Sequence, residues 1–207
     1  MKDVLPLVYL VRHGETAWSI GGQHTGRSDI ALTGQGERDA RLLKDRLHGL
    51  CFAKVLSSPL QRAWITSDLA GFGAQAQADK DLMEWDYGTY DGRRTVDIKV
   101  ERPDWRLFED GCPGGEMVAD VSARADRVIT KIRDSEGNVL VFAHRDILRI
   151  LVARWIALPG LEGRRFDLAT TAVSILGYDH NVDEPVIRLL NDVTYHAQRT
   201  PHEQVKG

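Results

Sequence analysis

Four short segments of the sequence carry side chains that could act together on a phosphate group. The first is Arg12-His13-Gly14, which directly follows the apolar run Leu7–Val11. Later segments contribute Arg62, Glu84 and His144. Two histidines, two arginines and one carboxylate could supply a nucleophile, charge neutralisation for the phosphate oxygens and a proton for the leaving alcohol. This set of residues suits phosphoryl transfer through a phosphohistidine.

Each of these residues suits one step of that chemistry. We expect His13 to be the nucleophile, with one ring nitrogen attacking while a hydrogen bond holds the other. Arg12 and Arg62 can each fork onto phosphate oxygens. His144 can donate to the phosphate, and Glu84 can protonate the leaving oxygen and then activate water. One such residue alone is more often structural. Five of them, each at the end of a predicted element, favour catalysis.

The apolar pattern predicts the elements that position these residues. Apolar runs predict strands at Leu7–Val11, Val55-Leu56, Val139–Ala143, Ala172–Leu176 and Val186–Leu190, the last near a sheet edge. Helical spacing predicts helices from Thr33 to about Leu50, from a capping box at Ser58-Pro59-Leu60-Gln61 to Gly71 or Gly73, over Val96–Arg102, along a stripe from Val118 to Ile132, and after His144 to Ile156.

This order of elements predicts a three-layer α/β/α sandwich with a mostly parallel sheet. The strand ends at residues 12, 57 and 143 should then share one edge, which is where open α/β folds bind ligands. Residues 83–116 read as a long excursion over that edge. We expect one domain over residues 1–196, followed by a polar, frayed tail at 197–207.

Composition and charge narrow the class of protein. Apolar residues make up 43% of the 207 residues, charged residues 28%, and the net charge is −3. These values predict a soluble globule that does not bind nucleic acid or membrane surfaces. Cys51 and Cys112 fit no disulfide framework or metal site and suggest free thiols in a reducing cytosol. With no signal-peptide pattern and no long apolar run, we expect a cytoplasmic protein, and the sequence leaves a homodimer open.

Together, these segments resemble the histidine phosphatase superfamily, which includes cofactor-dependent phosphoglycerate mutase and many phosphatases. The resemblance rests on Leu10–Thr16, Thr25-Gly26, Leu32-Thr33 with Gly36, Ser57–Ala63, Glu84 with Tyr87-Gly88, Pro113–Glu116 and Ala143-His144. It implies that His13 is phosphorylated and that Arg12, Arg62 and His144 complete the phosphate pocket. It also implies that Glu84 is the proton donor, that Thr25 and Gly26 lie beside the substrate, and that no metal or other cofactor is needed.

Within the family, the segments Gly21–Arg27 and Glu84–Gly88 resemble sugar-phosphate phosphatases of the sedoheptulose-bisphosphatase type and bacterial acid phosphatases. The family's mutases usually carry Asn at the position of Ser19, Lys near Thr95 and a long insert that closes the site. Here only about twenty residues separate Gly92 from Pro113, and a short cover protects a phosphohistidine from water less well. The resemblance therefore implies a metal-independent phosphatase acting on small monoesters, sugar phosphates among them.

Two other functions stay open at this point. One is a phosphoglycerate mutase. The other, more remote, is a non-catalytic module that binds phosphorylated ligands, which loss of His13 or Glu84 would have favoured.

Several residues carry two interpretations. The family commonly has Gly where this chain has Arg145, which Asp146 follows. Either Arg145 points to solvent and Asp146 merely suits a helix N-terminus, or Arg145 adds a cation at the pocket mouth. His24 could touch substrate or only stabilise its loop. We therefore take Ser19, His24 and Arg145, with Thr25 and Gly26, as candidate substrate-binding residues. The aromatic residues Trp85, Tyr87, Tyr90 and Trp105 could line a cleft or pack on the core, and His48, His180, His196 and His202 read as surface residues.

Overall fold

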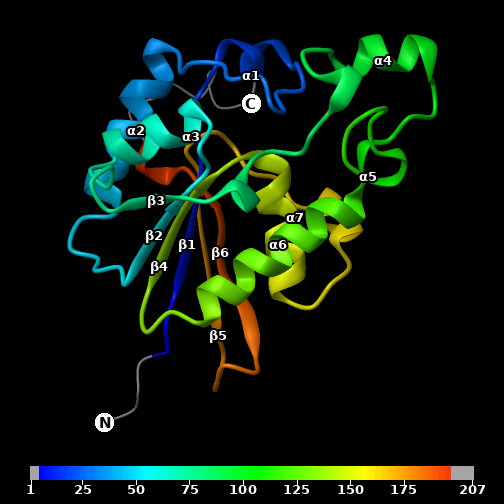
Figure 1. Cartoon of the computed structure of the whole chain (residues 1–207). Coiled ribbons are helices and arrows are strands. Elements are labelled where there is room, and N and C mark those ends of the chain that lie inside the picture. The colour runs from blue at the N-terminus through cyan, green and yellow to red at the C-terminus, as the bar shows by residue number, and fades with distance from the viewer. Residues whose placement is uncertain (1–4, 197–207) are drawn as a thin grey trace.

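A six-stranded sheet forms the centre of the computed structural model, which describes residues 5–196 (Figure 1). The strand order is β3-β2-β4-β1-β5-β6. All neighbouring strands pair in parallel except around β5, which is antiparallel to both β1 and β6. The strands are β1 (Val8–Arg12), β2 (Lys54–Ser57), β3 (Ala76–Ala78), β4 (Val139–Ala143), β5 (Val173–Tyr178) and β6 (Pro185–Asp192). The mostly parallel sheet and the edge position of the last strand are confirmed, whereas the short β3 was not predicted.

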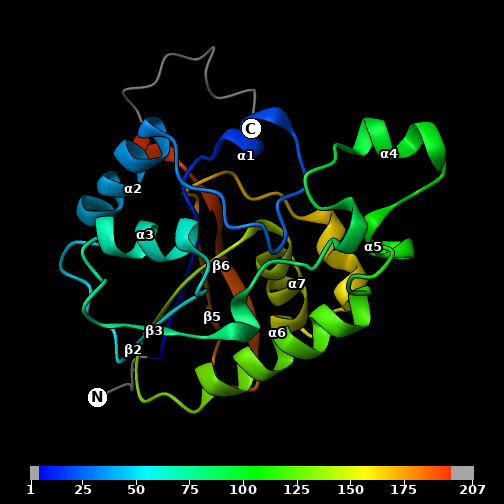
Figure 2. The same cartoon turned by 45° about the horizontal axis from the view of Figure 1, so that its top comes forward.

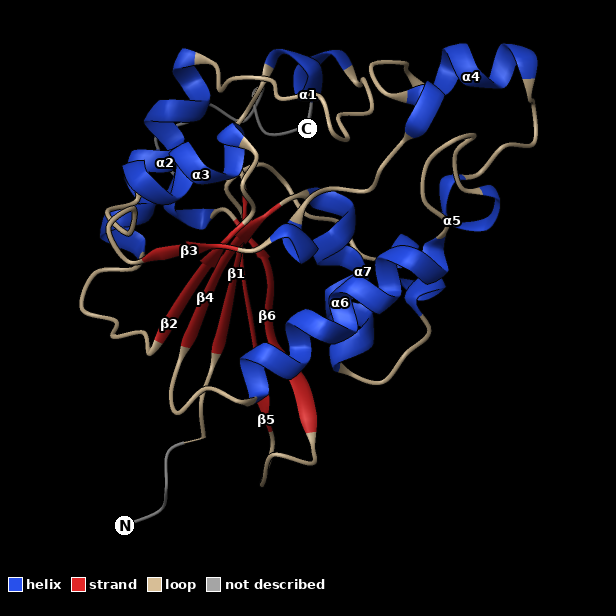
Figure 3. Cartoon of the chain, in the orientation of Figure 1, coloured by secondary structure: helices blue, strands red, loops and turns tan. Residues whose placement is uncertain are grey.

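Helices cover both faces of this sheet and complete three layers (Figure 3). One face carries α2 (Gly34–Arg46) and α3 (Gln61–Leu69), and the other carries α6 (Val118–Arg133) and α7 (Arg145–Trp155). Shorter helices are α1 (Ala17–Gly21), α4 (Thr95–Glu101) and α5 (Leu107–Asp110), with 3₁₀ turns η1 (Lys80–Leu82), η2 (Gly88–Tyr90), η3 (Gly160–Arg165) and η4 (Thr194–His196). The α/β/α sandwich is therefore confirmed.

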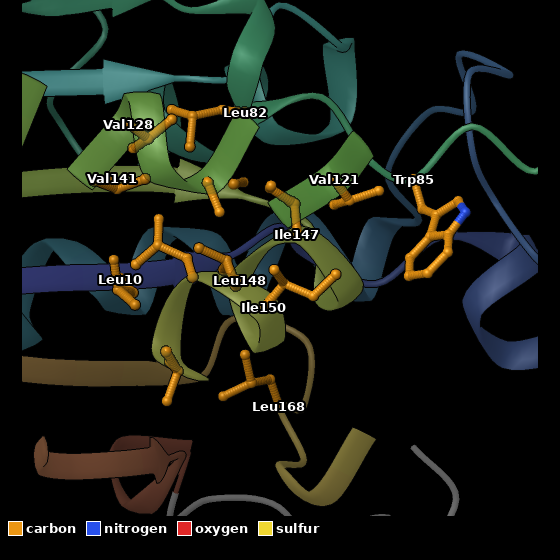
Figure 4. Close-up of a cluster of buried hydrophobic side chains, with 14 of the residues drawn as sticks. Leu10, Leu82, Trp85, Val121, Val128, Val141, Ile147, Leu148, Ile150 and Leu168 are labelled. Carbon is orange, nitrogen blue, oxygen red and sulfur yellow. The ribbon is translucent and has the colours of Figure 1, made fainter. Parts of the chain in front are cut away.

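Two apolar cores hold the layers together. The larger one packs α6 and α7 onto the sheet, with Leu10 and Val141 facing Val128 and Leu148 (Figure 4). The smaller one joins the other face to α2 and α3. Trp85, Tyr90 and Trp105 are buried within the larger core. The packing interpretation therefore holds for these three aromatic residues, because the loop that carries them folds down onto the core.

One helix start follows the sequence prediction and another does not. Thr33 caps α2, since its hydroxyl accepts from the Gly36 N–H at 2.9 Å. The capping box predicted at Ser58 is wrong: α3 begins at Gln61 after Leu60, which makes no side-chain cap. The Ser58 hydroxyl accepts from the Leu60 N–H at 3.3 Å and also lies 2.7 Å from Nε2 of His144, so it joins a long-range contact that the local pattern did not predict.

A buried arginine anchors the start of the excursion over the sheet edge. The Arg124 guanidinium, on α6, donates to the carbonyls of Asp81 and Met83 at 2.7 Å. It also forms a two-pronged pair with Glu116, at 2.7 and 2.8 Å. Because these bonds hold the chain on both sides of Glu84, the position of that carboxylate is set by α6. The sequence analysis did not single out Arg124.

The tail expected at 197–207 and His202 lie outside the described residues. Within residues 5–196, no helix combines the length and apolarity needed to cross a membrane.

Candidate active site

The predicted convergence of strand ends is confirmed. In the parallel pair β1–β4, Arg12 lies opposite Ala143, and the His13 N–H donates to the Ala143 carbonyl at 2.9 Å. At the end of β2, the Ser58 N–H donates to the Phe142 carbonyl at 2.9 Å. These bonds continue the ladders one residue beyond each strand. They deliver His13, Ser58 and His144 to one edge of the sheet, above which α1 and α4 lie (Figures 1 and 2).

A pocket of about 130 Å³ opens at this edge. It brings together seven of the ten predicted site residues, namely Arg12, His13, Ser19, His24, Thr25, Glu84 and Arg145. Gly22, Gln23, Tyr87, Thr95 and Asp146 complete the lining. Gly26, Arg62 and His144 are not part of the lining and are buried. They connect to it through the hydrogen bonds described below.

His13 is held in one orientation by its own backbone. Its Nδ1 lies 2.7 Å from the Gly14 carbonyl, which can only accept, so Nδ1 carries the proton. Nε2 is then the nitrogen with a free lone pair, and it makes no hydrogen bond to the described residues. Burial, followed by the nearby charges of Arg62 and Arg12, lowers the pKa of His13 well below its usual range. The ring is therefore neutral near pH 7, as a nucleophile requires.

Arg12 presents an unused donor beside His13. Its Nη1 donates to the Leu168 carbonyl at 2.6 Å, which fixes the side chain across the site. Its Nε is buried and lacks a hydrogen-bond partner among the described residues. A buried donor without a partner costs free energy, and a phosphate oxygen would satisfy it. Burial and the charge of Arg145 lower the pKa of Arg12 to about 10, which leaves it a cation near neutral pH.

Glu84 is a buried carboxyl that also caps a helix. It accepts from the backbone N–H groups of Asp146 and Ile147 at 3.0 Å, at the start of α7, and from its neighbour Trp85 at 2.9 Å. Burial raises the pKa of Glu84, and the charge of Asp146 raises it further against these hydrogen bonds. A carboxyl with a raised pKa can keep a proton for a leaving group.

Arg62 lies behind the pocket rather than in it. Its Nε donates to His144 Nδ1 at 3.0 Å, Nη1 donates to the Ser28 carbonyl at 2.9 Å, and Nη2 donates to the carbonyls of Thr25 and Gly26 at 3.0 and 2.9 Å. Four of the five N–H groups of a guanidinium are thus used within the protein. One N–H of Arg62 remains for a phosphate oxygen in this arrangement, and the expected fork of Arg62 onto phosphate stays a prediction.

His144 is oriented by Arg62 and Ser58. Since the Arg62 Nε donates to Nδ1, the proton of the neutral ring lies on Nε2, 2.7 Å from the Ser58 hydroxyl. The two histidine rings are neighbours, with centroids 5.2 Å apart. Burial, Arg62 and His13 lower the pKa of His144 well below its usual range. Ser58 is therefore a site residue that sequence reasoning assigned to a helix cap.

Gly26 is required by close packing. A Cβ there would lie 2.8 Å from both the Trp85 carbonyl oxygen and the Tyr87 ring. Its N–H donates to Asp91 at 2.9 Å, and this bond fixes the loop whose preceding residue, Thr25, lines the pocket.

Ser19 and His24 reach the pocket from the loop that includes α1. The Ser19 hydroxyl accepts from the Thr16 N–H at 2.9 Å, so it completes a capping box while it lines the pocket. His24 Nε2 lies 3.1 Å from the Thr95 hydroxyl, and its ring packs 4.7 Å from that of Tyr87. Burial lowers the pKa of His24. Both interpretations of His24 thus remain compatible with its place, in the loop and in the lining.

The side chains of Arg145 and Asp146 lie in different environments. Arg145 lines the pocket with its side chain 48% exposed, whereas the Asp146 carboxylate is buried beside it. Asp146 pairs with Arg149 at 2.7 Å and accepts from the Tyr87 hydroxyl. Burial raises the pKa of Asp146, but Arg149, Arg145 and the Tyr87 hydroxyl outweigh burial and lower it overall. The view of Asp146 as merely suited to a helix N-terminus is therefore wrong, and its spacing of three residues from Arg149 was the available signal.

Of the described residues, the other histidine, cysteine and metal-binding candidates do not line the pocket. His196 is buried and its Nε2 lies 3.0 Å from the Thr171 hydroxyl, so its assignment to the surface is wrong. Cys51 and Cys112 are free thiols, as expected. Among residues 5–196, one group could offer three metal ligands, the exposed Asp179, His180 and Glu184 between β5 and β6, and none of the three lines the pocket.

Comparison with known proteins places this site in a family. The model of the histidine phosphatase superfamily, branch 1, matches residues 8–193. An acid phosphatase from Mycobacterium tuberculosis is 40% identical over 84% of this chain and 87% of its own length. Sedoheptulose 1,7-bisphosphatase from Saccharomyces cerevisiae is 29% identical over 91% of this chain and 94% of its own. A Salmonella choleraesuis protein named a probable phosphoglycerate mutase is 30% identical, with 84% and 86% covered.

This chain also has the same fold as a solved structure. The product of an open reading frame from Mycobacterium tuberculosis superposes with a TM-score of 0.82 at 36% identity, covering 90% of this chain and 97% of its own. The match spans the sheet, both helical layers and the segments that carry His13, Glu84 and His144. The chain belongs to the histidine phosphatase superfamily, branch 1.

Proposed function

We propose that this protein is a metal-independent phosphatase that hydrolyses small phosphate monoesters, sugar phosphates among them, through a phosphohistidine on His13. One observation carries the proposal: Nδ1 of His13 is held by the Gly14 carbonyl, while Nε2 is free in a pocket that also contains the unpartnered Nε of Arg12 and the carboxyl of Glu84. A nucleophile, an oxygen-binding donor and a proton source are thereby within one small space.

The reaction proceeds in two steps. In the first, the Nε2 lone pair of His13 attacks phosphorus, the bond between phosphorus and the ester oxygen breaks, and the leaving oxygen takes the proton of Glu84. In the second, the Glu84 carboxylate takes a proton from water, whose oxygen attacks phosphorus and breaks the bond to Nε2. Inorganic phosphate leaves, and both side chains return to their starting protonation.

The other charged residues support this chemistry from fixed positions. Arg12 neutralises phosphoryl oxygens through Nε. Arg62 acts mainly as a positioning residue, since it orients His144 and the loop of Thr25 and Gly26. In the free protein the Nε2–H of His144 points to the Ser58 hydroxyl. When substrate binds, the same N–H donates to a phosphoryl oxygen. Arg62 can offer a phosphoryl oxygen the one N–H that the described residues leave unused.

Hydrolysis is favoured over the mutase reaction. Two of the relatives above are named phosphatases, including the one at 40% identity. Thr95 lines the pocket, so the position near which the family's mutases carry Lys is neutral here. The net charge of −3 and the two free cysteines further suit an enzyme that acts in the cytoplasm on small molecules rather than on nucleic acid or membranes.

The mechanism is tested by tracing labelled phosphate from the substrate to the enzyme and to solution. Wild-type enzyme mixed with labelled substrate and quenched in alkali should carry base-stable, acid-labile phosphate, and His13→Ala should lose both this label and turnover. Release of inorganic phosphate should greatly exceed isomerisation of a phosphoglycerate, with or without added bisphosphoglycerate. A chelator should leave the rate unchanged. Turnover by His13→Ala, or strict dependence on a divalent ion, would contradict the mechanism, and efficient isomerisation would restore the mutase.

A further inference from the structure

Arg145 is a cation at the pocket mouth whose N–H groups are available. Its guanidinium makes no hydrogen bond within residues 5–196. Its nearest carboxylate is Asp167, at 3.5 Å, and that side chain is 72% exposed. Because such an exposed pair contributes little to stability, a ligand anion could replace Asp167 at little cost.

Asp146 and Asp167 attract Arg145 and raise its pKa against burial, but neither carboxylate accepts a hydrogen bond from it within residues 5–196. Asp146 is already paired with Arg149 and the Tyr87 hydroxyl. Burial and, after it, the charge of Asp146 raise the pKa of Glu84. Arg12 and Arg145 both line this small pocket, and the charge of Arg145 lowers the pKa of Arg12, second to burial. A ligand with negative charge near each of them would relieve this repulsion.

The two cations lie at different depths. Arg12 is adjacent to His13, and both His13 and Glu84 are only 4% exposed, so the transferred phosphoryl group must enter the buried end. Arg145 is half exposed and lines the outer part, with the neutral Thr95 also in the lining. A phosphoryl group seated on Nε2 of His13 and Nε of Arg12 would leave Arg145 to meet the far end of the substrate.

We propose that Arg145 forms a second anion subsite, which selects phosphate esters that carry a further phosphate or carboxylate group on the alcohol. The inference rests on the proposed function and names its substrate class: sugar bisphosphates and phosphorylated sugar acids rather than esters with neutral tails. Arg145 binds the group that stays with the product, and the transferred phosphoryl belongs to Arg12 and His13.

The experiment compares kcat/KM for one sugar bisphosphate, the matching sugar monophosphate and an aryl phosphate in wild type, Arg145→Gln and Arg94→Ala. Arg94 is the matched control, since it is a 53% exposed arginine next to Thr95 but pairs with Asp97 and does not line the pocket. Arg94→Ala removes the same net charge, and it should change kcat/KM only slightly and by the same factor for all three substrates.

Arg145→Gln should lower kcat/KM for the bisphosphate by about ten- to a hundredfold, the effect of losing one charge-assisted contact. The loss on the monophosphate and the aryl phosphate should be smaller by at least about tenfold, and the change should appear mainly in KM. Equal losses on all three substrates, or an equal effect of Arg94→Ala, would overturn the subsite. If wild type hydrolyses the aryl phosphate through His13 but Arg145→Gln lowers kcat/KM no more for the bisphosphate than for the other two substrates, only this inference fails. If the labelled phosphohistidine is absent, the proposed function fails.

Discussion

Replacing Glu84 with Gln tests the proton transfer most directly. The carboxylate accepts three backbone hydrogen bonds, from Trp85, Asp146 and Ile147. Gln has one acceptor oxygen, which can keep the bonds from Trp85 and Ile147 and the longer bond from Asp146 at 3.2 Å, while its NH₂ group would replace the oxygen that accepts from Asp146 at 3.0 Å. A fully unsatisfied buried donor would cost about 1–3 kcal/mol, so the loss of this one shorter bond costs less than the 5–15 kcal/mol that typically stabilises a domain. Glu84→Gln should therefore fold with a lower melting temperature.

The effect on rate should depend on the leaving group. A general acid contributes about 10²–10⁴-fold, and an alkyl phosphate needs that proton because an alkoxide is a poor leaving group. A nitrophenyl phosphate does not need it, since nitrophenolate leaves unprotonated near pH 7. Glu84 must also act as base in the second step, so Glu84→Gln should accumulate the phosphohistidine.

Rapid mixing with nitrophenyl phosphate separates these effects. Glu84→Gln should release a burst of about one nitrophenolate per site, at a rate within about tenfold of wild type, followed by slow turnover. The first turnover on glycerol phosphate should slow by about 10²–10⁴-fold. Glu101→Gln, an exposed carboxylate of α4, is the control and should match wild type. Equal slowing on both substrates without a burst would refute the role of Glu84 as acid and base.

Three further outcomes follow from the geometry of the site. Asp146→Asn removes a negative charge that, after burial, raises the pKa of Glu84, so the alkaline limb of the pH profile of kcat/KM should move to lower pH; an unmoved limb would count against the coupling. Gly26→Ala places a Cβ 2.8 Å from a backbone oxygen and should destabilise the fold by about 1–3 kcal/mol, measured by urea unfolding; no change in the unfolding midpoint would show that the loop can shift. Burial lowers the pKa of both His13 and His144 below the ordinary value of about 6.5. The unfolded chain therefore binds these protons first, and stability should be full above about pH 6.5 and fall as the pH decreases from there. A melting temperature that stays flat from pH 7.5 to 5 would argue that one of the rings is protonated in the fold.

Local pattern was enough to predict the sheet and the residues at its edge. Apolar runs ending at Arg12 and Ala143 predict buried parallel strands, and parallel strands must end at a common edge. The places of His13 and His144 then follow from the sequence, because each stands immediately beyond a strongly apolar strand, whereas Glu84 follows only a short 3₁₀ turn. Thr33 illustrates the same locality, since its cap depends on groups within one helical turn.

The contacts within the site depended on the tertiary structure. The Ser58 hydroxyl and His144 are 86 residues apart, and Arg62 bonds to His144 across 82 residues. No local pattern specifies which of several acceptors a hydroxyl or a guanidinium will choose, since only the packed fold brings the competing groups within 3 Å. For that reason the sequence analysis assigned Ser58 only to a helix cap and did not predict the bond between Arg62 and His144.

The pairing of the charges of Arg145 and Asp146 also depended on the tertiary structure. The sequence by itself determined that Arg145 and Asp146 begin a helix and depart from the family pattern. The tertiary structure buried the Asp146 carboxylate against Arg149 and Tyr87, and left the Arg145 guanidinium half exposed at the pocket mouth. Adjacent residues on a helix point in directions about 100° apart, so one can face the core while its neighbour faces the pocket. Which of the two charges is compensated, and which is free for a ligand, depends on the groups that the fold places around each side chain.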